Sequence, residues 1–250
     1  MSSIDFSSSL PPADATDAPK RRQRRKDARP QEMLQAALEL FAEKGYAATR
    51  LEDIAARVGV SKGTVYLYFD SKEALFQGLI RDGALPIVEA VEGMVDAVGH
   101  QPARDLLRSV LYSYWEGIGN TPLGAIHKVM VCEARNFPEI AEYYNEIYIR
   151  RGRELLKRVL ELGIARGEFR AVNPEVLLDV VFAPMMMLTI WRNSVGLCAE
   201  VAFTPDQFID THLDLLLNGG LVAPAATDVA EAADVTTAPA PQPPAPPCEN

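Results

Sequence analysis

The side chains best suited to chemistry stand together at residues 59–68, which read GVSKGTVYLY. Ser61, Lys62 and Thr64 surround the expected start of a short helix, and Ser61 can cap its free backbone N–H groups. Amides, hydroxyl groups and an ammonium at a helix N-terminus suit phosphate oxygens, and such a helix end can enter the major groove of DNA. These residue types therefore indicate a DNA-binding element.

The same stretch also has the Gly-x-Ser-x-Gly spacing of a hydrolase nucleophile, from Gly59 to Gly63. That serine follows a buried strand, whereas residues 53–58 have the pattern of a helix. The histidines that could act as a base are few: His100, His127 and His212. No paired catalytic residues, Gly-rich phosphate loop or metal motif is present in the sequence, so we predict no catalytic residues, no metal and no cofactor.

Two predicted helices joined by a tight turn would position these side chains. Thr49 and Glu52 have capping-box spacing, so the first helix should begin at Leu51. Gly59 suits the residue after its C-terminus, where the backbone needs a positive φ, and Val65 should point inward from the second helix. This pattern is a helix-turn-helix. A plain helical hairpin buried in a core would not need a Ser-Lys-Gly-Thr start.

A helix on each side completes the unit. An apolar stripe follows Pro30, and Gly45 should end that helix. Asp70 and Glu73 again have capping-box spacing and should open a long helix, residues 71–98, that leads into the rest of the chain.

The remaining sequence is helical in pattern and shows no sustained β alternation. Breaks rich in Gly, Pro and Asn separate predicted helices at about 102–118, 122–135, 138–167, 174–197 and 205–218. We therefore predict an all-α fold in four parts: a disordered extension with a basic arm (1–29), a three-helix DNA-binding domain (30–75), a larger helical domain (76–220) and a disordered Ala/Pro-rich tail (221–250).

Charge is distributed unevenly along this acidic chain. The net charge is −9, but residues 20–72 hold 12 basic and 7 acidic residues, a balance of +5. The remainder holds 13 of the 25 basic and 27 of the 34 acidic residues, a balance of −14. Such asymmetry is expected when one region meets phosphate. The run KRRQRRKDAR at 20–29 is either a solvated charge run or an arm that reaches phosphates or the minor groove, and we favour the arm.

The chain has the features of a cytoplasmic protein. Its three cysteines have no metal-ligand or redox spacing: Cys132, Cys198 and Cys248. No apolar run of signal-peptide type occurs near the N-terminus. The most hydrophobic stretch, residues 180–191, is too short to span a bilayer and contains Pro184, so we predict no membrane partner.

The stretch ALELFAEKGYAATRLEDIAARVGVSKGTVYLYFDSKEALF, residues 37–76, resembles the TetR family of bacterial transcriptional regulators. The resemblance runs from about residue 30 to residue 79, and the segment EARNFP at 133–138 is more weakly similar to one in a branch of the C-terminal domains. It implies a homodimer on a palindromic operator in double-stranded DNA. It also implies a regulator, usually a repressor, that is released by a small molecule bound in the larger domain.

The resemblance also assigns DNA contacts by position. They would be Thr49, Arg50, Ser61, Lys62, Gly63, Thr64, Tyr66, Tyr68 and Lys72. Thr49, Tyr68 and Lys72 would hold the DNA backbone. Lys62 and Thr64 are better placed to read base edges, and Tyr66 could do either.

The family further implies a ligand pocket. Aromatic, soft or polar residues that could line it are Tyr112, Trp115, His127, Met130, Arg135, Phe137, Tyr144, Met187 and Trp191, each of which could equally pack in the core. A ligand there would move the helix at 71–98 and change the spacing of the two recognition helices, which must match about 34–36 Å.

The dimer surface is predicted at about 174–218. Residues 180–191 are apolar on nearly every face, and Leu213, Leu216 and Leu217 share one face of the following helix. Two other functions stay open: an enzyme housed in the larger domain, and a DNA-binding module that works through a protein partner without a small ligand. The acidic second half and the Pro-rich tail support the protein-partner alternative.

Overall fold

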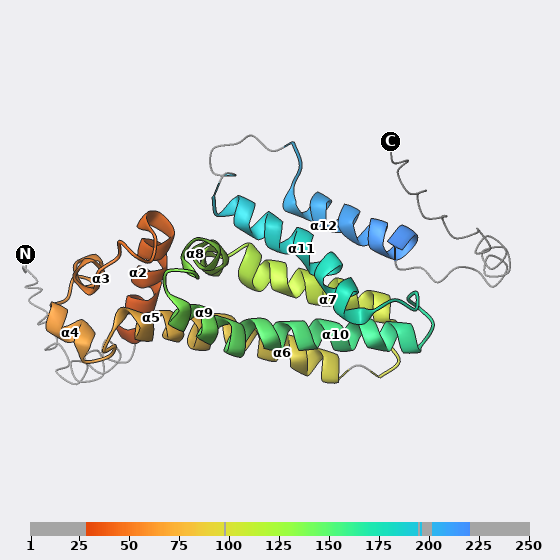
Figure 1. Ribbon diagram of the computed structural model, residues 1–250, viewed down its shortest axis with the longest axis horizontal. Helices are drawn as coiled ribbons and strands as arrows, with labels where there is room; N and C mark the ends of the chain where they lie inside the picture. The colour runs from red at the N-terminus through yellow and green to blue at the C-terminus, as the bar shows by residue number, and fades with distance from the viewer. Residues whose placement is uncertain (1–28, 98, 195, 197–201, 221–250) are drawn as a thin grey trace, which may run out of the picture.

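The computed structural model describes residues 29–97, 99–194, 196 and 202–220, so the basic arm and the tail lie outside the described residues. Within these ranges the chain is built from helices, and the predicted all-α fold is confirmed. The molecule is elongated, with the small N-terminal domain at one end and a layered helical domain at the other (Figure 1).

The N-terminal domain contains α2 (Arg29–Lys44), α3 (Leu51–Val58), α4 (Lys62–Tyr66) and the start of α5 (Lys72–Gly78). The apolar stripe of α2 is buried as predicted: Met33, Leu34, Ala37, Leu38 and Phe41. Gly45 follows α2 with a φ of +85°. The stripe gives the two short helices α3 and α4 a surface to pack against.

One continuous helical rod leaves this domain. It begins with α5, passes through a π-helical turn, η1 (Leu79–Ala84), and continues as α6 (Leu85–Asp96). The cap is Ser71, whose Oγ accepts a hydrogen bond from the Ala74 N–H at 3.1 Å, so the predicted capping role of Asp70 is wrong. Pro86 near the start of α6 has no N–H to donate to the preceding turn, which accounts for the changed hydrogen-bond pattern before it.

The larger domain contains the remaining helices. They are α7 (Ala103–Tyr114), η2 (Trp115–Gly119), η3 (Pro122–Gly124), α8 (Ala125–Glu133), α9 (Pro138–Tyr144), η4 (Asn145–Ile149), α10 (Arg150–Ala165), α11 (Pro174–Arg192), α12 (Pro205–Asp214) and η6 (Leu215–Gly220). The predicted helix breaks are close to those observed, but the predicted helix at 138–167 contains the π-helical turn η4, and that at 174–197 ends at Arg192.

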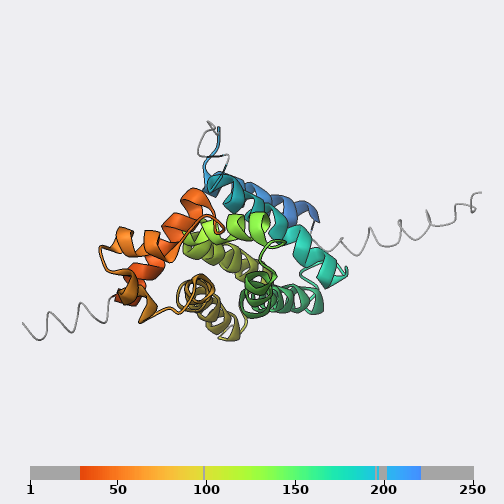
Figure 2. The same cartoon turned by 60° about the vertical axis from the view of Figure 1, so that its left-hand side comes forward.

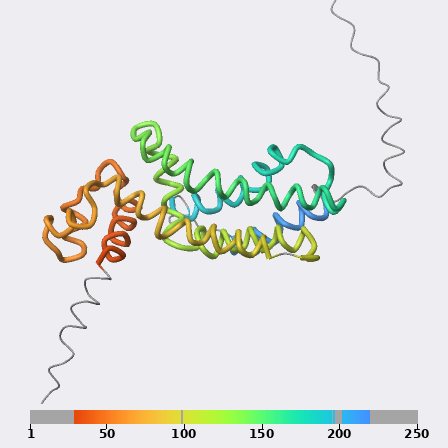
Figure 3. Tube along the Cα trace, turned by 90° about the horizontal axis from the view of Figure 1, so that it is seen from below, coloured from red at the N-terminus to blue at the C-terminus, as the bar shows by residue number. Residues whose placement is uncertain are grey.

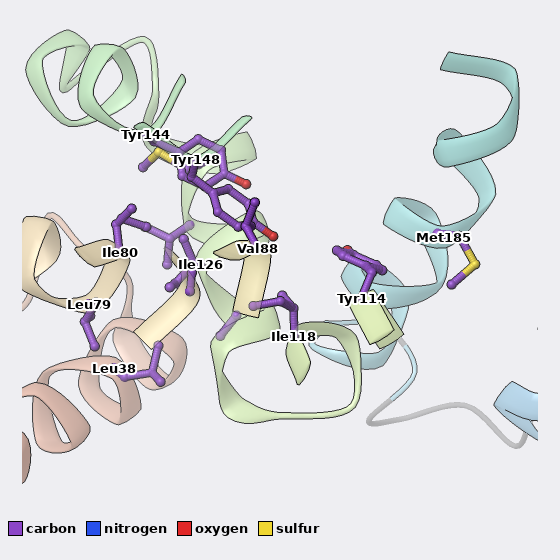
Figure 4. Packing of buried hydrophobic residues seen from close by; sticks show 14 of the residues in the cluster. Leu38, Leu79, Ile80, Val88, Tyr114, Ile118, Ile126, Tyr144, Tyr148 and Met185 are labelled. Carbon is purple, nitrogen blue, oxygen red and sulfur yellow. The ribbon is translucent and has the colours of Figure 1, made fainter. Parts of the chain in front are cut away.

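These helices pack in layers. α10 lies against α6, α7 and α11, while α12 covers α7 and α11 from outside. Figure 2 shows α11 and α12 along one side of the long bundle that α6, α7 and α10 form, and Figure 3 shows α6 and α10 side by side along its length. α8 runs across the end of this bundle and packs on α2 (Figure 1). The hydrophobic core is therefore continuous from the N-terminal domain, at Leu38, to the larger domain, at Tyr148 and Met185 (Figure 4).

Candidate nucleic-acid interface and ligand cavity

The turn between α3 and α4 depends on one glycine. Gly59 has a φ of +74°, and its N–H donates to the Ala56 carbonyl at 3.2 Å, while the Val60 N–H donates to the Ala55 carbonyl at 2.9 Å. No neighbouring heavy atom lies within 4 Å of where a Cβ would stand, so conformation rather than space requires glycine here. The predicted turn is confirmed.

The N-terminus of α4 faces solvent. Ser61 caps it as predicted, because its Oγ accepts from the Thr64 N–H at 3.2 Å and lies 2.8 Å from the Thr64 hydroxyl. Ser61, Lys62 and Gly63 are exposed, whereas Val65 is fully buried against the domain core. The helix is thus anchored by one face and presents the other, with its free N-terminal end, to a partner.

In the absence of DNA, contacts with neighbouring side chains hold the Lys62 ammonium against the protein surface. It forms an ion pair with Glu52 of α3 and lies 5.6 Å from the centre of the Tyr66 ring. The hydrogen bond to Glu52 raises the pKa of Lys62, which keeps the side chain cationic. Contact with a base edge would require Lys62 to leave Glu52. Tyr66 is 44% exposed next to Lys62 on α4, and Arg50 is exposed directly before the start of α3.

Thr49 does not have the role predicted for it. Its side chain is buried, and its hydroxyl donates to the carbonyls of Gly45 at 2.7 Å and Leu40 at 3.3 Å. The cap of α3 is instead formed by Asp53, whose carboxylate accepts from the Arg50 N–H at 2.9 Å. Both the Thr49–Glu52 capping box and the DNA contact of Thr49 are therefore incompatible with the structure, although α3 begins at Leu51 as predicted.

Lys72 also points inward. Its Nζ donates to the carbonyls of Tyr46 at 2.7 Å and Ala47 at 3.3 Å and lies 4.3 Å from the centre of the Tyr46 ring. Burial lowers the pKa of Lys72. This ammonium braces the loop before α3 and, in this arrangement, is not directed at a phosphate. Tyr68, the other predicted backbone contact, is half-buried and packs against the core.

The segment at residues 133–138 joins the two domains. Glu133 at the end of α8 accepts a hydrogen bond from the Ala47 N–H at 3.1 Å, and the Phe137 ring lies 4.9 Å from the Tyr46 ring. Lys128 of α8 donates to the Ala42 carbonyl at 3.3 Å. These contacts between the domains were not predicted from the sequence, because they connect positions 86 apart along the chain and no local sequence pattern indicates them.

A cavity of about 220 Å³ lies inside the larger domain, between α6, α7, η2, η4, α10 and α11. Its walls are mainly aliphatic and aromatic and include Val88, Val110, Ile118, Leu156, Leu178 and Phe182. Four lining residues have polar side chains: Tyr114, Tyr148, Arg153 and Asp179. The last two form an ion pair and are both partly exposed, which places them at the solvent end.

None of the nine predicted pocket residues lines this cavity. Trp115 and Met130 are buried in the core, and His127 and Tyr144 lie in an aromatic cluster with Tyr148. The other five are located elsewhere: Phe137 at the domain joint, Tyr112 in a hydrogen bond to Asp210 at 2.8 Å, and Arg135, Met187 and Trp191 at the surface. Residue type suggested which side chains could contact a ligand. The way the helices face one another determines which of them reach the cavity.

The inner wall of the cavity is polar but uncharged. The Tyr114 hydroxyl lies 3.0 Å from the Thr189 hydroxyl and 3.4 Å from Nε2 of His127. Burial lowers the pKa of His127 to about 4 and raises the pKa of Tyr114 to about 12, so both are neutral near pH 7. Burial likewise raises the pKa of Tyr148.

The outer face of α11 is apolar. Its exposed large hydrophobic residues are Val176, Val180, Met187 and Trp191, and Leu215 is exposed after α12. Leu213 and Leu216, predicted for a dimer surface, are instead buried within their own chain.

α11 is longer than the apolar stretch at residues 180–191 and, by length and composition alone, is the one described helix that could cross a membrane. Core helices of soluble proteins meet the same criterion. Among the described residues, no group of three or more His, Cys, Asp or Glu could hold a metal ion.

Comparison with known proteins identifies the family. The profile of bacterial regulatory proteins of the tetR family matches residues 33–79, and that of tetracyclin repressor-like C-terminal domains matches residues 100–195. The HTH-type transcriptional regulator YfiR of Bacillus subtilis is 31% identical over 174 residues, which cover 67% of this chain and 81% of YfiR. The chain belongs to the TetR family.

Other members of the TetR family agree with this assignment over most of the chain. The transcriptional repressor KstR2 of Rhodococcus jostii is 29% identical over 214 residues, covering 84% of this chain and 96% of KstR2. The crystal structure of the regulator FadR from Bacillus subtilis, in complex with stearoyl-CoA, superposes with a TM-score of 0.62 at 23% identity. That alignment covers 76% of this chain and 98% of FadR and supports the shared fold.

Membership of the TetR family excludes the enzyme considered above. The chain is a DNA-binding transcriptional regulator and not an enzyme. The helix-turn-helix is α3 with α4, and the N-terminal end of α4 is exposed.

Proposed function

We propose that this TetR-family regulator is a cytoplasmic homodimeric repressor that binds a palindromic operator and is released by a small molecule in its cavity. The observation that carries the proposal is the connection between the two sites. The rod formed by α5, η1 and α6 begins beside the helix-turn-helix, and three residues of α6 line the cavity: Ile87, Val88 and Val91.

The DNA-contacting residues that we retain are those whose side chains or backbone reach the surface. They are Arg50, Ser61, Lys62, Gly63, Thr64 and Tyr66, with Tyr68 at the edge of this surface. Thr49 and Lys72 contribute indirectly, because their hydrogen bonds fix the loop that precedes α3. Tyr66 lies beside Lys62, with its ring centre 5.6 Å from the Lys62 Nζ, and the single α4 of each subunit would cover one half-site.

The dimer would form through the apolar outer face of α11 together with Leu215. Exposed Val180, Met187 and Trp191 lie along this one helix, and burying them against the same face of a second copy would remove a contiguous apolar area from water. A two-fold axis parallel to the long axis of the molecule in Figure 1 would place both α4 helices at the same end of the dimer. Replacing Met187 with Glu should give monomers in sedimentation velocity, whereas the same replacement at exposed Val131 on α8 should leave the dimer intact.

The cavity supports the release step. Related structures contain small ligands: FadR of Bacillus subtilis holds stearoyl-CoA, and a regulator from Saccharomonospora viridis holds choline. The cavity in this chain has room for a ligand, and one of its walls is α6, which continues through η1 and α5 to the DNA-binding domain.

The test begins with the operator. Purified protein is used to select genomic DNA fragments, and a shared inverted repeat with half-sites one helical turn apart is the expected result. Metabolites of the neighbouring genes are then screened for stabilisation of the protein against heat and for release of the selected DNA. Fragments without a repeat would contradict the dimeric mode of binding. A partner protein that is needed for specific binding would replace the ligand-responsive function with the partner-dependent one.

A further inference from the structure

The cavity contains one hydrogen-bonding group that the protein leaves unused. Tyr148 lines the cavity and is only 6% exposed, yet its hydroxyl has no hydrogen-bond partner among the described residues. Nearly all of the side chain is enclosed, but the hydroxyl is not among the fully buried unpaired polar atoms of the described residues, so it is accessible from the cavity and can hydrogen-bond a molecule there. Figure 4 shows Tyr148 with Val88, Ile118 and Tyr114, all of which line this cavity.

The Tyr114 and Thr189 hydroxyls beside it are already engaged, whereas the fully buried Nδ1 of His127 has no hydrogen-bond partner but belongs to a residue that does not line the cavity. Thr189 donates its hydroxyl hydrogen to the Met185 carbonyl at 3.0 Å, so the Tyr114 hydroxyl, 3.0 Å away, must be the donor to Thr189. Tyr114 therefore has no hydrogen left to offer to the cavity. The hydroxyl of Tyr148 remains as a free donor on the inner wall.

The inner end of the cavity disfavours charge. Its polar neighbours Tyr114, Tyr148 and His127 are all neutral near pH 7, because burial raises the pKa values of the tyrosines and lowers that of His127. The one cation in the wall, Arg153, is paired with Asp179 at the solvent end. A carboxylate or ammonium drawn into this space would lose its hydration without gaining a counter-ion.

Size limits the ligand further. An apolar cavity of about 150 Å³ in another protein holds benzene, so about 220 Å³ matches a molecule of roughly eight to ten carbons. A longer ligand would extend past Arg153 and Asp179 into solvent.

We propose that the cavity binds a largely apolar, uncharged molecule with a hydrogen-bond-accepting oxygen, such as a ketone, and that the Tyr148 hydroxyl donates to this oxygen. The binding site stands on the geometry of the cavity. Its role as an effector site rests on the proposed function.

Three probes with the same number of carbon atoms test this assignment: 1-phenyl-1-propanone, n-propylbenzene and 3-phenylpropanoate. Isothermal titration calorimetry of the full chain near pH 7 should show the ketone binding about three- to tenfold more tightly than the hydrocarbon, the range that one neutral hydrogen bond provides. The carboxylate should bind most weakly. Tyr148→Phe should reduce the ketone to the affinity of the hydrocarbon and leave the hydrocarbon unchanged.

A second variant tests the location. Gly152 of α10 lines the cavity, and no neighbouring heavy atom lies within 4 Å of where its Cβ would stand, so Gly152→Met should fill the space without disturbing the core. Binding of the ketone and the hydrocarbon should be lost. Gly93→Met is the matched control, because Gly93 is equally unobstructed on α6 but lies outside the cavity.

Several results would overturn the assignment: no binding of any probe, a carboxylate that binds as tightly as the ketone, a ketone preference that survives Tyr148→Phe, or binding that survives Gly152→Met.

Fluorescence anisotropy with the selected operator separates this inference from the proposed function. Ketone binding that leaves operator affinity unchanged would contradict ligand-induced release while confirming the site. Failure of every probe in a protein that still binds its operator would remove the site alone.

Discussion

Two glycines four residues apart should respond to alanine in opposite ways. Gly59 has a φ of +74°, where an L-residue costs about 1–2 kcal/mol. Alanine also restricts the unfolded chain, which offsets about 0.4–1 kcal/mol of that cost. Because no atom obstructs the new Cβ, no steric cost is added. Gly59→Ala should therefore lower the free energy of unfolding by about 1 kcal/mol, or the melting temperature by about 2–4 °C.

Gly63 is the matched position on the DNA side of the turn. It lies in α4 with negative φ, and its Cβ would meet only the Ser61 Oγ at 3.8 Å, an ordinary contact. Gly63→Ala should raise the free energy of unfolding by up to about 0.5–1 kcal/mol, because alanine favours the helix. Its methyl group would nevertheless stand on the exposed face proposed to meet DNA. Overpacking a close contact costs about 1–3 kcal/mol, so operator affinity should fall at least about fivefold.

The two variants are compared by urea unfolding, followed by circular dichroism, and by fluorescence anisotropy with labelled operator at a temperature where both are folded. Gly59→Ala should be less stable but bind the operator within about twofold of the parent, which is below 0.5 kcal/mol. Gly63→Ala should be at least as stable but bind weakly. A stable Gly59→Ala protein would refute the conformational argument. An unchanged affinity for Gly63→Ala would place the DNA away from the N-terminus of α4.

Three further predictions concern Lys62, residues 1–28 and the buried His127. Lys62→Ala should weaken operator binding selectively, by about 1–3 kcal/mol, whereas Arg104→Ala, which removes an exposed charge on α7, should have no effect; equal loss on random DNA would assign Lys62 to phosphate. Deleting residues 1–28 should weaken binding to all DNA sequences in anisotropy titrations. The slope of the logarithm of the binding constant against the logarithm of the salt concentration should become shallower by about 0.9 per lost phosphate contact, and an unchanged slope would show that the arm makes no phosphate contact. Because the pKa of His127 is lowered from 6.5 to about 4, the unfolded chain binds more protons between these values; the free energy of unfolding should fall by about 3 kcal/mol as pH drops through this window, and urea unfolding of His127→Phe should show a smaller decrease.

Local features of the helix-turn-helix were predictable because their causes are local. The positive φ at Gly59 and the cap at Ser61 each involve residues within three or four positions, and both are present. The wrong predictions concern side chains that had two nearby hydrogen-bonding alternatives. Thr49 bonds backward to Gly45 instead of forward into α3, and Asp53 supplies the cap, although Thr-x-x-Glu spacing favoured Thr49.

Distant contacts were not predictable from pattern. Lys72 is held by carbonyls that precede it by 25 and 26 positions, and Glu133 reaches Ala47 across 86. Tyr114 reached the cavity while the adjacent Trp115 was buried elsewhere, because neighbours on a helix point about 100° apart. The helical register that decides between them is set by packing with α10 and α11, which the chain order alone does not specify.

The position of α8 explains how one cavity can influence a surface at the far end of the molecule. Near its start, His127 packs on the Tyr148 ring with centroids 6.0 Å apart and hydrogen-bonds Tyr114 at 3.4 Å. At its end, Glu133 accepts a hydrogen bond from the Ala47 N–H, within the loop that leads into α3. A helix transmits displacement along its axis because its backbone hydrogen bonds keep it rigid. Any ligand that moves Tyr148 must therefore either deform the packing of His127 or shift α8, and a shift of α8 changes the support of the helix-turn-helix in addition to the rod of α5, η1 and α6.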